Sequence, residues 1–243
     1  MAHEQIPARA RVYIDAVIAA GAMVWVYAGL QHSLPHGLFF WTCFALGILA
    51  AMMKVRMPRV EGTFSLGFVA ALIGIQELGF AEAVAVGSVV GLTQAVWRPQ
   101  VRPSSIQVVF NVANVAIATA VAYCSYRPGL LGGPNEGSIG LLLWAAGLFY
   151  ITNTGIVAGV LCLLERKPLG QVFEHWCVWS FWYFLAGAVL VGFAHFLAGS
   201  AFASLTLLPS MFITYFVYRA YVRSRSDAAN RRAKADNRSL LAG

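Results

Sequence analysis

Long apolar runs separated by short polar segments are the feature that most constrains this chain. An α-helix rises about 1.5 Å per residue, so about 20 apolar residues cross the roughly 30 Å of bilayer hydrocarbon. Eight runs reach or approach that length. They are Val12–Leu30, Leu38–Met53, Phe64–Leu78, Ala81–Trp97, Ile106–Tyr126, Ile139–Leu164, Trp176–Leu197 and Phe202–Val222. The pattern predicts an all-α fold, a polytopic transmembrane helix bundle of about eight spans.

Composition supports this prediction. Hydrophobic residues make up 59% of the 243 residues and charged residues 11%, against about 45–50% and about 25% in soluble domains. Little length remains for a folded soluble domain. We therefore expect a transmembrane helical domain over residues 1–222 and a basic cytoplasmic juxtamembrane tail over residues 223–243. The first run lacks a small-residue cleavage site, so we expect it to be retained as a span.

The positions of the basic residues predict the topology. With eight spans and an internal N-terminus, 16 of the 17 lysines and arginines fall in internal segments and only Arg127 falls outside. Cytoplasmic loops of bacterial membrane proteins carry such an excess of positive charge. We therefore expect a multi-pass protein of the bacterial cytoplasmic (inner) membrane with both termini in the cytoplasm. The net charge of +7 is then a topology signal, and no nucleic-acid partner is expected.

The third and fourth runs are short and only Gly79 and Phe80 lie between them. They could form two spans joined by a tight turn, one long tilted helix, or a re-entrant pair. The distribution of basic residues favours two spans, because one crossing from Phe64 to Trp97 would place a basic cluster on the external side.

Amide side chains mark the fifth and sixth runs. Gln107, Asn111 and Asn114 are spaced by four and three residues, which places them on one helical face, and Asn153 lies near the middle of the sixth run. Polar groups in hydrocarbon require partners, so we expect Asn111 and Asn114 to meet Asn153 between the two helices. Two interpretations stay open: interhelical hydrogen bonds that hold helices together, or a site for a small-molecule ligand.

A second polar group flanks the turn between the third and fourth runs. Gln76, Glu77 and Glu82 are expected at the external interface, where water would solvate the carboxylates. Glu77 still belongs to the apolar run, so it is the candidate for a cation or proton site at the mouth of a cavity. Separately, the spacings Gly87–Gly91 and Gly155–Gly159 are typical of close helix crossings, which we expect within the bundle.

Motifs for other chemistry are absent from the sequence. It contains no HExxH, Walker or GxSxG motif, and its four cysteines include no CxxC pair. We therefore expect no catalytic residues, no metal ligands and no cofactor. A membrane enzyme acting on lipid stays open as an alternative without a supporting motif.

Four segments carry a resemblance to a known family: KVRMPRVEGTFSLGF, QAVWRPQVRPSSIQVVFNVANVAIA, NTGIVAGVLCLLERKPLGQVFEHWCVWSFWYFLAGA and FVYRAYVRSR. Together they resemble the integral-membrane sensor region at the N-terminus of some bacterial cyclic-di-GMP enzymes of the GGDEF and HD-GYP kinds. In that family the last span continues into a cytoplasmic linker and an output domain. No GGDEF or HD-GYP sequence is present in this chain, so the resemblance implies a sensor module without its own output domain.

Two functions follow as expectations. The first is a sensory and signal-transducing membrane module, which passes a membrane or ligand signal through its last helix to a cytoplasmic signalling protein. The second is a small-molecule transporter or substrate-binding membrane subunit, in which Gln107, Asn111, Asn114 and Asn153 would line a site at the membrane midplane. The lipid bilayer is a partner in both, and a small-molecule ligand is possible in either.

Overall fold

A computed structural model describes residues 7–31, 37–56, 63–97, 99, 102–127, 139–165 and 184–193. The chain divides into two units, Met1–Leu208 and Pro209–Gly243. All described residues belong to the first unit. The predicted last run, Phe202–Val222, and the predicted tail, residues 223–243, lie outside the described residues, as does most of the seventh run.

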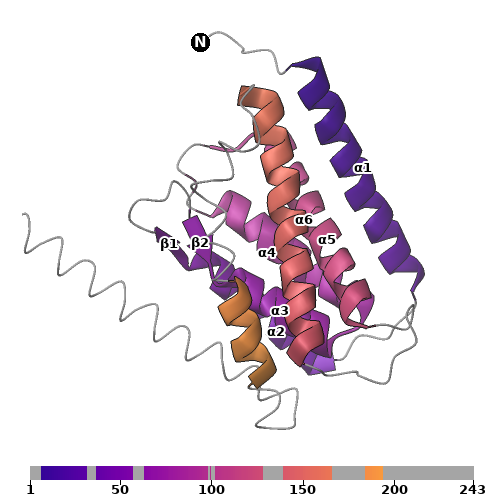
Figure 1. The fold of residues 1–243 in the computed structure, drawn as a ribbon, viewed down its shortest axis with the longest axis vertical. Coiled ribbons are helices and arrows are strands. Elements are labelled where there is room, and N and C mark those ends of the chain that lie inside the picture. Colours follow the sequence, from indigo (N-terminus) through magenta and orange to yellow (C-terminus); the bar gives the residue numbers. More distant parts are fainter. Residues whose placement is uncertain are drawn as a thin grey trace, which may run out of the picture. The chain divides into compact units, whose positions relative to one another are not determined.

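The described part is helical apart from one short hairpin (Figure 1). The helices are α1 (Ala8–Leu30), α2 (Gly37–Met52), α3 (Gly67–Glu77), α4 (Phe80–Val96), α5 (Ser105–Tyr126), α6 (Ile139–Glu165) and a seventh helix, Phe184–Phe193. Three of them, α1, α5 and α6, are long and apolar enough to cross a membrane, and the other four are shorter apolar helices. The chain is therefore a helical membrane protein.

Helices α4, α5 and α6, which follow one another along the chain, run in alternating directions, and α1 runs parallel to α5. Ile14 of α1 packs with Phe110 of α5, and Ala28 of α1 packs with Ala120 of α5, so α1 and α5 are parallel. A Cβ atom at Gly91 of α4 would contact Val115 of α5, whereas one at Gly87 would contact Thr119, so α4 is antiparallel to α5. On α6, Val160 packs with Phe110, and Asn153 bonds to Asn114, so α6 is also antiparallel to α5.

This arrangement separates the described basic side chains into two groups. Arg9 and Arg11 at the start of α1, Lys54 after α2 and Arg102 before α5 lie at one end, here called the basic end. Arg127, directly after α5, lies at the opposite end. The same division was predicted from the sequence, with Arg127 on the other side from the rest.

The third and fourth runs form a helical hairpin. Helix α3 ends at Glu77, Leu78 and Gly79 are extended, and α4 begins at Phe80. A Cβ at Gly74 would lie 3.7 Å from both Ala83 and Val86, so the two helices pack side by side. The alternative of one long tilted helix over both runs is therefore wrong. Helix α3 is also shorter than the predicted run: its 11 residues span about 16 Å, about half of the hydrocarbon thickness.

A two-stranded antiparallel hairpin occupies the loop between α2 and α3, where the sequence predicted only helix and loop. Strand β1 (Lys54–Arg56) pairs with β2 (Thr63–Ser65), with Lys54 opposite Ser65 and Arg56 opposite Thr63. The strands take the first residues of the predicted third run. Pairing supplies partners for backbone groups that would otherwise be left unsatisfied near the bilayer.

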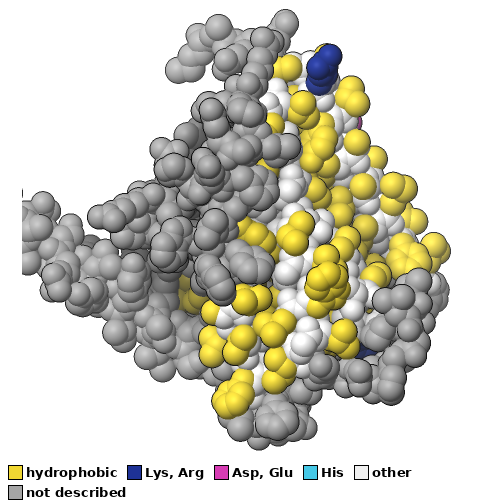
Figure 2. Space-filling view, in the orientation of Figure 1, with side chains coloured by type: hydrophobic (Ala, Val, Ile, Leu, Met, Phe, Trp, Pro, Cys, Tyr) yellow, Lys and Arg dark blue, Asp and Glu magenta, His cyan; other side chains and the backbone are white. Residues whose placement is uncertain are grey.

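Burial separates a central helix from helices that face outward. All residues of α3 from Gly67 to Gln76 are buried, whereas α1 and α6 expose large hydrophobic side chains such as Val26 and Ile151. On the face drawn in Figure 2, hydrophobic side chains cover the described surface, and dark blue is concentrated at the N-terminal end of α1. Such a surface is unfavourable in contact with water and favourable in contact with bilayer hydrocarbon.

Candidate functional site

Helix α5 begins with a capping box that uses one of the predicted site residues. The Ser104 N–H donates to Gln107 Oε1 over 2.8 Å, and the Gln107 N–H donates to Ser104 Oγ over 3.3 Å. Each side chain thus satisfies a backbone N–H group that the first helical turn leaves without a partner. Gln107 is exposed at this end of the helix, and the structure does not bring it together with Asn114 and Asn153.

Asn111, one turn further along α5, contacts a different helix from the one expected. Its Nδ2 donates to the backbone oxygen of Gly91 on α4 over 2.6 Å. The contact depends on the small residues of α4, because a Cβ at Gly91 would lie 2.9 Å from Val115 Cγ2 and one at Gly87 would overlap the hydroxyl of Thr119. The prediction that Gly87 and Gly91 mark a close crossing within the bundle is confirmed. The predicted contact of Asn111 with Asn153 is wrong.

Asn114 makes the predicted contact between α5 and α6. Its Nδ2 donates to Asn153 Oδ1 over 2.8 Å and lies 3.3 Å from the Asn153 backbone oxygen. Asn114 has 0% of its surface exposed, and Asn153 is half-buried. Asn111 and Asn114 together therefore join α5 to α4 on one side and to α6 on the other. A ligand-binding role for these amides stays a prediction.

Part of the hydrogen-bonding capacity of this pair has no partner. Asn114 Oδ1 is buried and accepts no hydrogen bond, and the Nδ2 group of Asn153 donates to none of the described residues. A buried acceptor without a donor destabilises a fold by about 1–3 kcal/mol. The pair therefore offers one buried acceptor and one donor on adjacent side chains.

Tyr13 adds a polar contact between α1 and α6. Its hydroxyl donates to the Ile156 backbone oxygen over 3.2 Å, and a Cβ at Gly159 would lie 2.6 Å from that hydroxyl. Gly155, the other glycine of this pair, has nothing within 4 Å of such a Cβ. Of these two glycines, only Gly159 lies at the contact between α1 and α6 in the described structure.

The opposite end from the basic end carries the second predicted group. Glu82 is buried, with 5% of its surface exposed, and its Oε2 accepts from the Gly79 N–H over 3.0 Å. The expectation that water solvates both carboxylates is therefore wrong for Glu82, which caps the start of α4. Glu77 is half-buried at the end of α3.

Arg127 ties two helix ends together at this side of the bundle. Its Nη2 donates to the Gln76 backbone oxygen over 3.1 Å, and its guanidinium lies 5.5 Å from the centre of the Tyr123 ring. A cation beside the last carbonyls of α3 also interacts favourably with the helix dipole. The Gln76 side chain is 7% exposed, and its Oε1 has no partner.

Lys54 has the corresponding role at the basic end. Its Nζ donates to the backbone oxygens of Gln94 and Trp97 over 2.7 and 2.6 Å, at the last turn of α4. Burial lowers the pKa of its ammonium group from the ordinary value, because a charged group loses hydration there. The sequence predicted only a topological role for Lys54 and for Arg127. Their positions did not signal these contacts, because Lys54 follows α2 but bonds to the end of α4, and Arg127 follows α5 but bonds to the end of α3.

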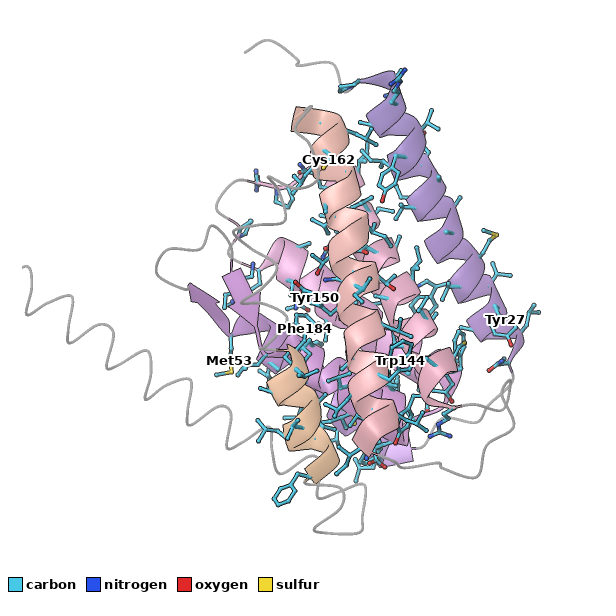
Figure 3. All side chains as sticks on the ribbon, in the orientation of Figure 1. Tyr27, Met53, Trp144, Tyr150, Cys162 and Phe184 are labelled. Carbon is cyan, nitrogen blue, oxygen red and sulfur yellow. The ribbon has the colours of Figure 1, made fainter. Side chains whose placement is uncertain are left out.

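An aromatic cluster surrounds Phe184 of the seventh helix. Its ring centre lies 4.3 Å from that of Phe68 on α3 and 5.1 Å from that of Tyr150 on α6, and Figure 3 shows Tyr150 and Phe184 side by side. The rings pack on one another, so this cluster is part of the core. Sequence reasoning did not identify it, because aromatic residues occur in every run.

Within the described ranges, no group of three or more His, Cys, Asp or Glu side chains is arranged to hold a metal ion. Comparison with protein-family models, with curated proteins and with solved structures finds no match to this chain. The candidate site therefore rests on its own geometry: the Asn114–Asn153 pair, with Asn111 one turn away on the same helix.

Proposed function

We propose that this chain is an integral-membrane sensory and signal-transducing module of the bacterial inner membrane. The observation that carries the proposal is the use of the intramembrane amides: Asn111 and Asn114 bond to α4 and α6 instead of lining an open path. A change at either contact alters how α5 packs on one neighbouring helix, α4 or α6. A signal can shift such a protein only if it favours one of two packing states over the other.

The proposed topology has eight spans with both termini in the cytoplasm. It is supported by the alternating helices and by the basic end, which would face the cytoplasm. Fusions of alkaline phosphatase and of green fluorescent protein test it. We expect phosphatase activity for fusions after Asn135, and fluorescence for fusions after Glu61 and after Gly243. Phosphatase activity at Gly243 would contradict the even number of spans.

The signal would leave through the last span and the basic segment that follows it. The resemblance to sensor regions of cyclic-di-GMP enzymes supports a signalling enzyme as the partner. The test compares the full chain with a variant that lacks residues 223–243, both purified from native membranes at equal yield. We expect enzymatic turnover of cyclic-di-GMP to accompany the full chain and to be lost from the truncated one.

A variant of the same length shows whether the charges of the segment are needed to hold the partner. Replacing Arg231, Arg232 and Lys234 by Gln keeps the length of the segment and removes its central charges. We expect this variant to retain the partner if the contact is made by helix packing, and to lose it if the contact is electrostatic. The sensory proposal fails if truncation leaves every co-purified activity and every cellular phenotype unchanged.

One observation favours transport as the second candidate function. Helix α3 covers about half of the hydrocarbon thickness, and interrupted helices of this kind form substrate sites in transporters. The complete burial of Asn114 favours the sensory module instead. Uptake of a solute by reconstituted vesicles, abolished in Asn114→Leu but not in Gln107→Ala, would decide for transport.

A further inference from the structure

The Asn114–Asn153 pair has hydrogen-bonding groups left over, and these define what could bind there. Asn114 Nδ2 bonds to Asn153 Oδ1, which leaves the buried Asn114 Oδ1 as an acceptor without a donor. Asn153 is half-buried, and its Nδ2 donates to none of the described residues. An amide nitrogen carries two N–H donors. The pair therefore presents an acceptor and a donor at neighbouring positions.

Among the described residues, no charged side chain bonds to the pair. Asp15 of α1 lies nearly as deep as Asn114, but its side chain is exposed. An ion bound to the pair would lose its hydration, and no described side chain of opposite charge is bonded there to offset the loss. A neutral group would lose far less.

We propose that Asn114 and Asn153 form a binding site for an uncharged molecule that carries a carboxamide or hydroxyl group. Such a group donates to Asn114 Oδ1 and accepts from Asn153 Nδ2, which satisfies both unused positions at once. This inference rests on the proposed sensory function and deepens it by naming the class of ligand. Binding would couple to helix packing, because the same two side chains hold α5 to α6.

The site also explains why an unpartnered acceptor is kept in the core. A site that must recognise an N–H or O–H group discriminates strongly against molecules without one, because its own buried polar atom is then left unsatisfied. An apolar molecule of the same size would leave Asn114 Oδ1 as it is. The expected preference is therefore for neutral hydrogen-bonding molecules over both charged and apolar ones.

The test uses the purified full chain in detergent with ¹⁵N-labelled asparagine and glutamine. Side-chain amide signals of Asn114 and Asn153 are assigned from the single variants Asn114→Leu and Asn153→Leu, and the Gln107 signal serves as the internal control. The probes are small three-carbon molecules of similar size: propionamide, 1-propanol, sodium propionate and propylammonium chloride. Propionamide and 1-propanol should shift the Asn114 and Asn153 signals saturably and leave the Gln107 signal unchanged. The two ions should shift none of these signals saturably.

Variants sharpen the result. Asn153→Leu removes the donor but leaves the backbone oxygen that Asn114 Nδ2 approaches at 3.3 Å, so the helices keep one contact. Loss of one hydrogen bond should weaken propionamide binding about tenfold. If this variant does not fold, the comparison of neutral and charged probes on the unaltered chain still decides.

A long-chain primary amide, oleamide, identifies the source of the ligand. Saturable shifts with propionamide indicate access from water, and shifts with oleamide alone indicate access from the bilayer; both support the site. Absence of saturable shifts, an equal response of Gln107, or equal binding of propylammonium overturns it. These outcomes do not depend on whether the signalling partner co-purifies. A chain that keeps its partner but binds no probe would still support the sensory function, with a membrane property as the stimulus.

Discussion

Asn114 and Asn153 are joined by a hydrogen bond of 2.8 Å between Nδ2 and Oδ1 across the interface of α5 and α6. Asn114 is fully buried and Asn153 is half-buried. The two ends of this bond are therefore not equivalent. Removal of the accessible partner leaves a buried amide without its shorter contact, whereas removal of the buried partner leaves an amide that other polar groups can reach.

We expect Asn153→Leu to destabilise the bundle more than Asn114→Leu, by about 1 kcal/mol, because an unsatisfied buried polar group is the more unfavourable outcome. Reversible unfolding in mixed micelles measures both. In the double variant the effects should not add, with a coupling of about 0.6–2 kcal/mol, the range of interhelical hydrogen bonds in membranes. Strictly additive effects would show that the bond contributes nothing to stability.

The crossing of α4 and α5 predicts a difference between glycines. Gly91→Ala should lower the free energy of unfolding by about 1–3 kcal/mol, because the added Cβ would lie 2.9 Å from Val115 Cγ2 and displace Asn111 from the Gly91 oxygen. Gly155→Ala is the matched control, since nothing lies within 4 Å of its Cβ. Thermal unfolding should leave the control unchanged or slightly stabilised. Equal losses in the two variants would contradict the crossing.

Arg127 is expected to stabilise the protein through its specific contacts as well as through its charge. Arg127→Ala should destabilise the protein by about 1 kcal/mol, because it removes the bond to the Gln76 oxygen and the contact with the Tyr123 ring. Arg102→Ala, which removes an exposed arginine before α5, should have little effect. Both are measured by unfolding in the same micelles, and an equal effect at Arg102 would point to net charge as the cause.

The capping box at the start of α5 gives a prediction for Gln107. Ser104→Ala should lower stability by about 1 kcal/mol, and Gln107→Ala by a similar amount or less, because each removes one half of the reciprocal bonds. Neither substitution should change the binding of propionamide at Asn114. If Gln107→Ala abolished probe binding while leaving stability unchanged, Gln107 would belong to the ligand site after all.

Lys54 predicts a dependence on pH. Burial lowers its pKa in the folded state, so between that value and the unfolded value near 10.5 the unfolded chain holds more protons. Stability should therefore fall as pH decreases from above 10.5 through the lowered pKa, and level off below it. Lys54→Met should lose this part of the pH dependence. Parallel pH profiles for the two proteins would show that Lys54 is solvated.

The sequence predicted the helices well where the apolar signal was long and less well where polar side chains had several possible partners. Helices α1, α5 and α6 follow their runs closely because about 20 apolar residues leave few alternatives in a bilayer. The Asn114–Asn153 contact followed from the need of a buried amide for a partner. The same argument assigned Asn111 to Asn153, although the backbone oxygen of Gly91 was an equally good acceptor.

Other features depend on tertiary structure that periodicity does not encode. The length of α3 was overestimated because Phe64 and Ser65 are apolar or neutral enough to continue a run, yet they pair with β1. Glu82 was expected in water because it follows a turn. Instead its carboxylate accepts a hydrogen bond from the Gly79 N–H within that turn. Gln107 matched the amide spacing and is used by the helix cap instead.

The packing of α1 against α5 has a consequence for biosynthesis. Gly21 of α1 faces Ala113 of α5, and α5 is complete only after about a hundred more residues have been translated, which takes roughly 5–20 s at typical rates. During that interval the first helix waits in the lipid without its main neighbour. The packing of α1 on α5 is therefore one of the later contacts of the bundle to form.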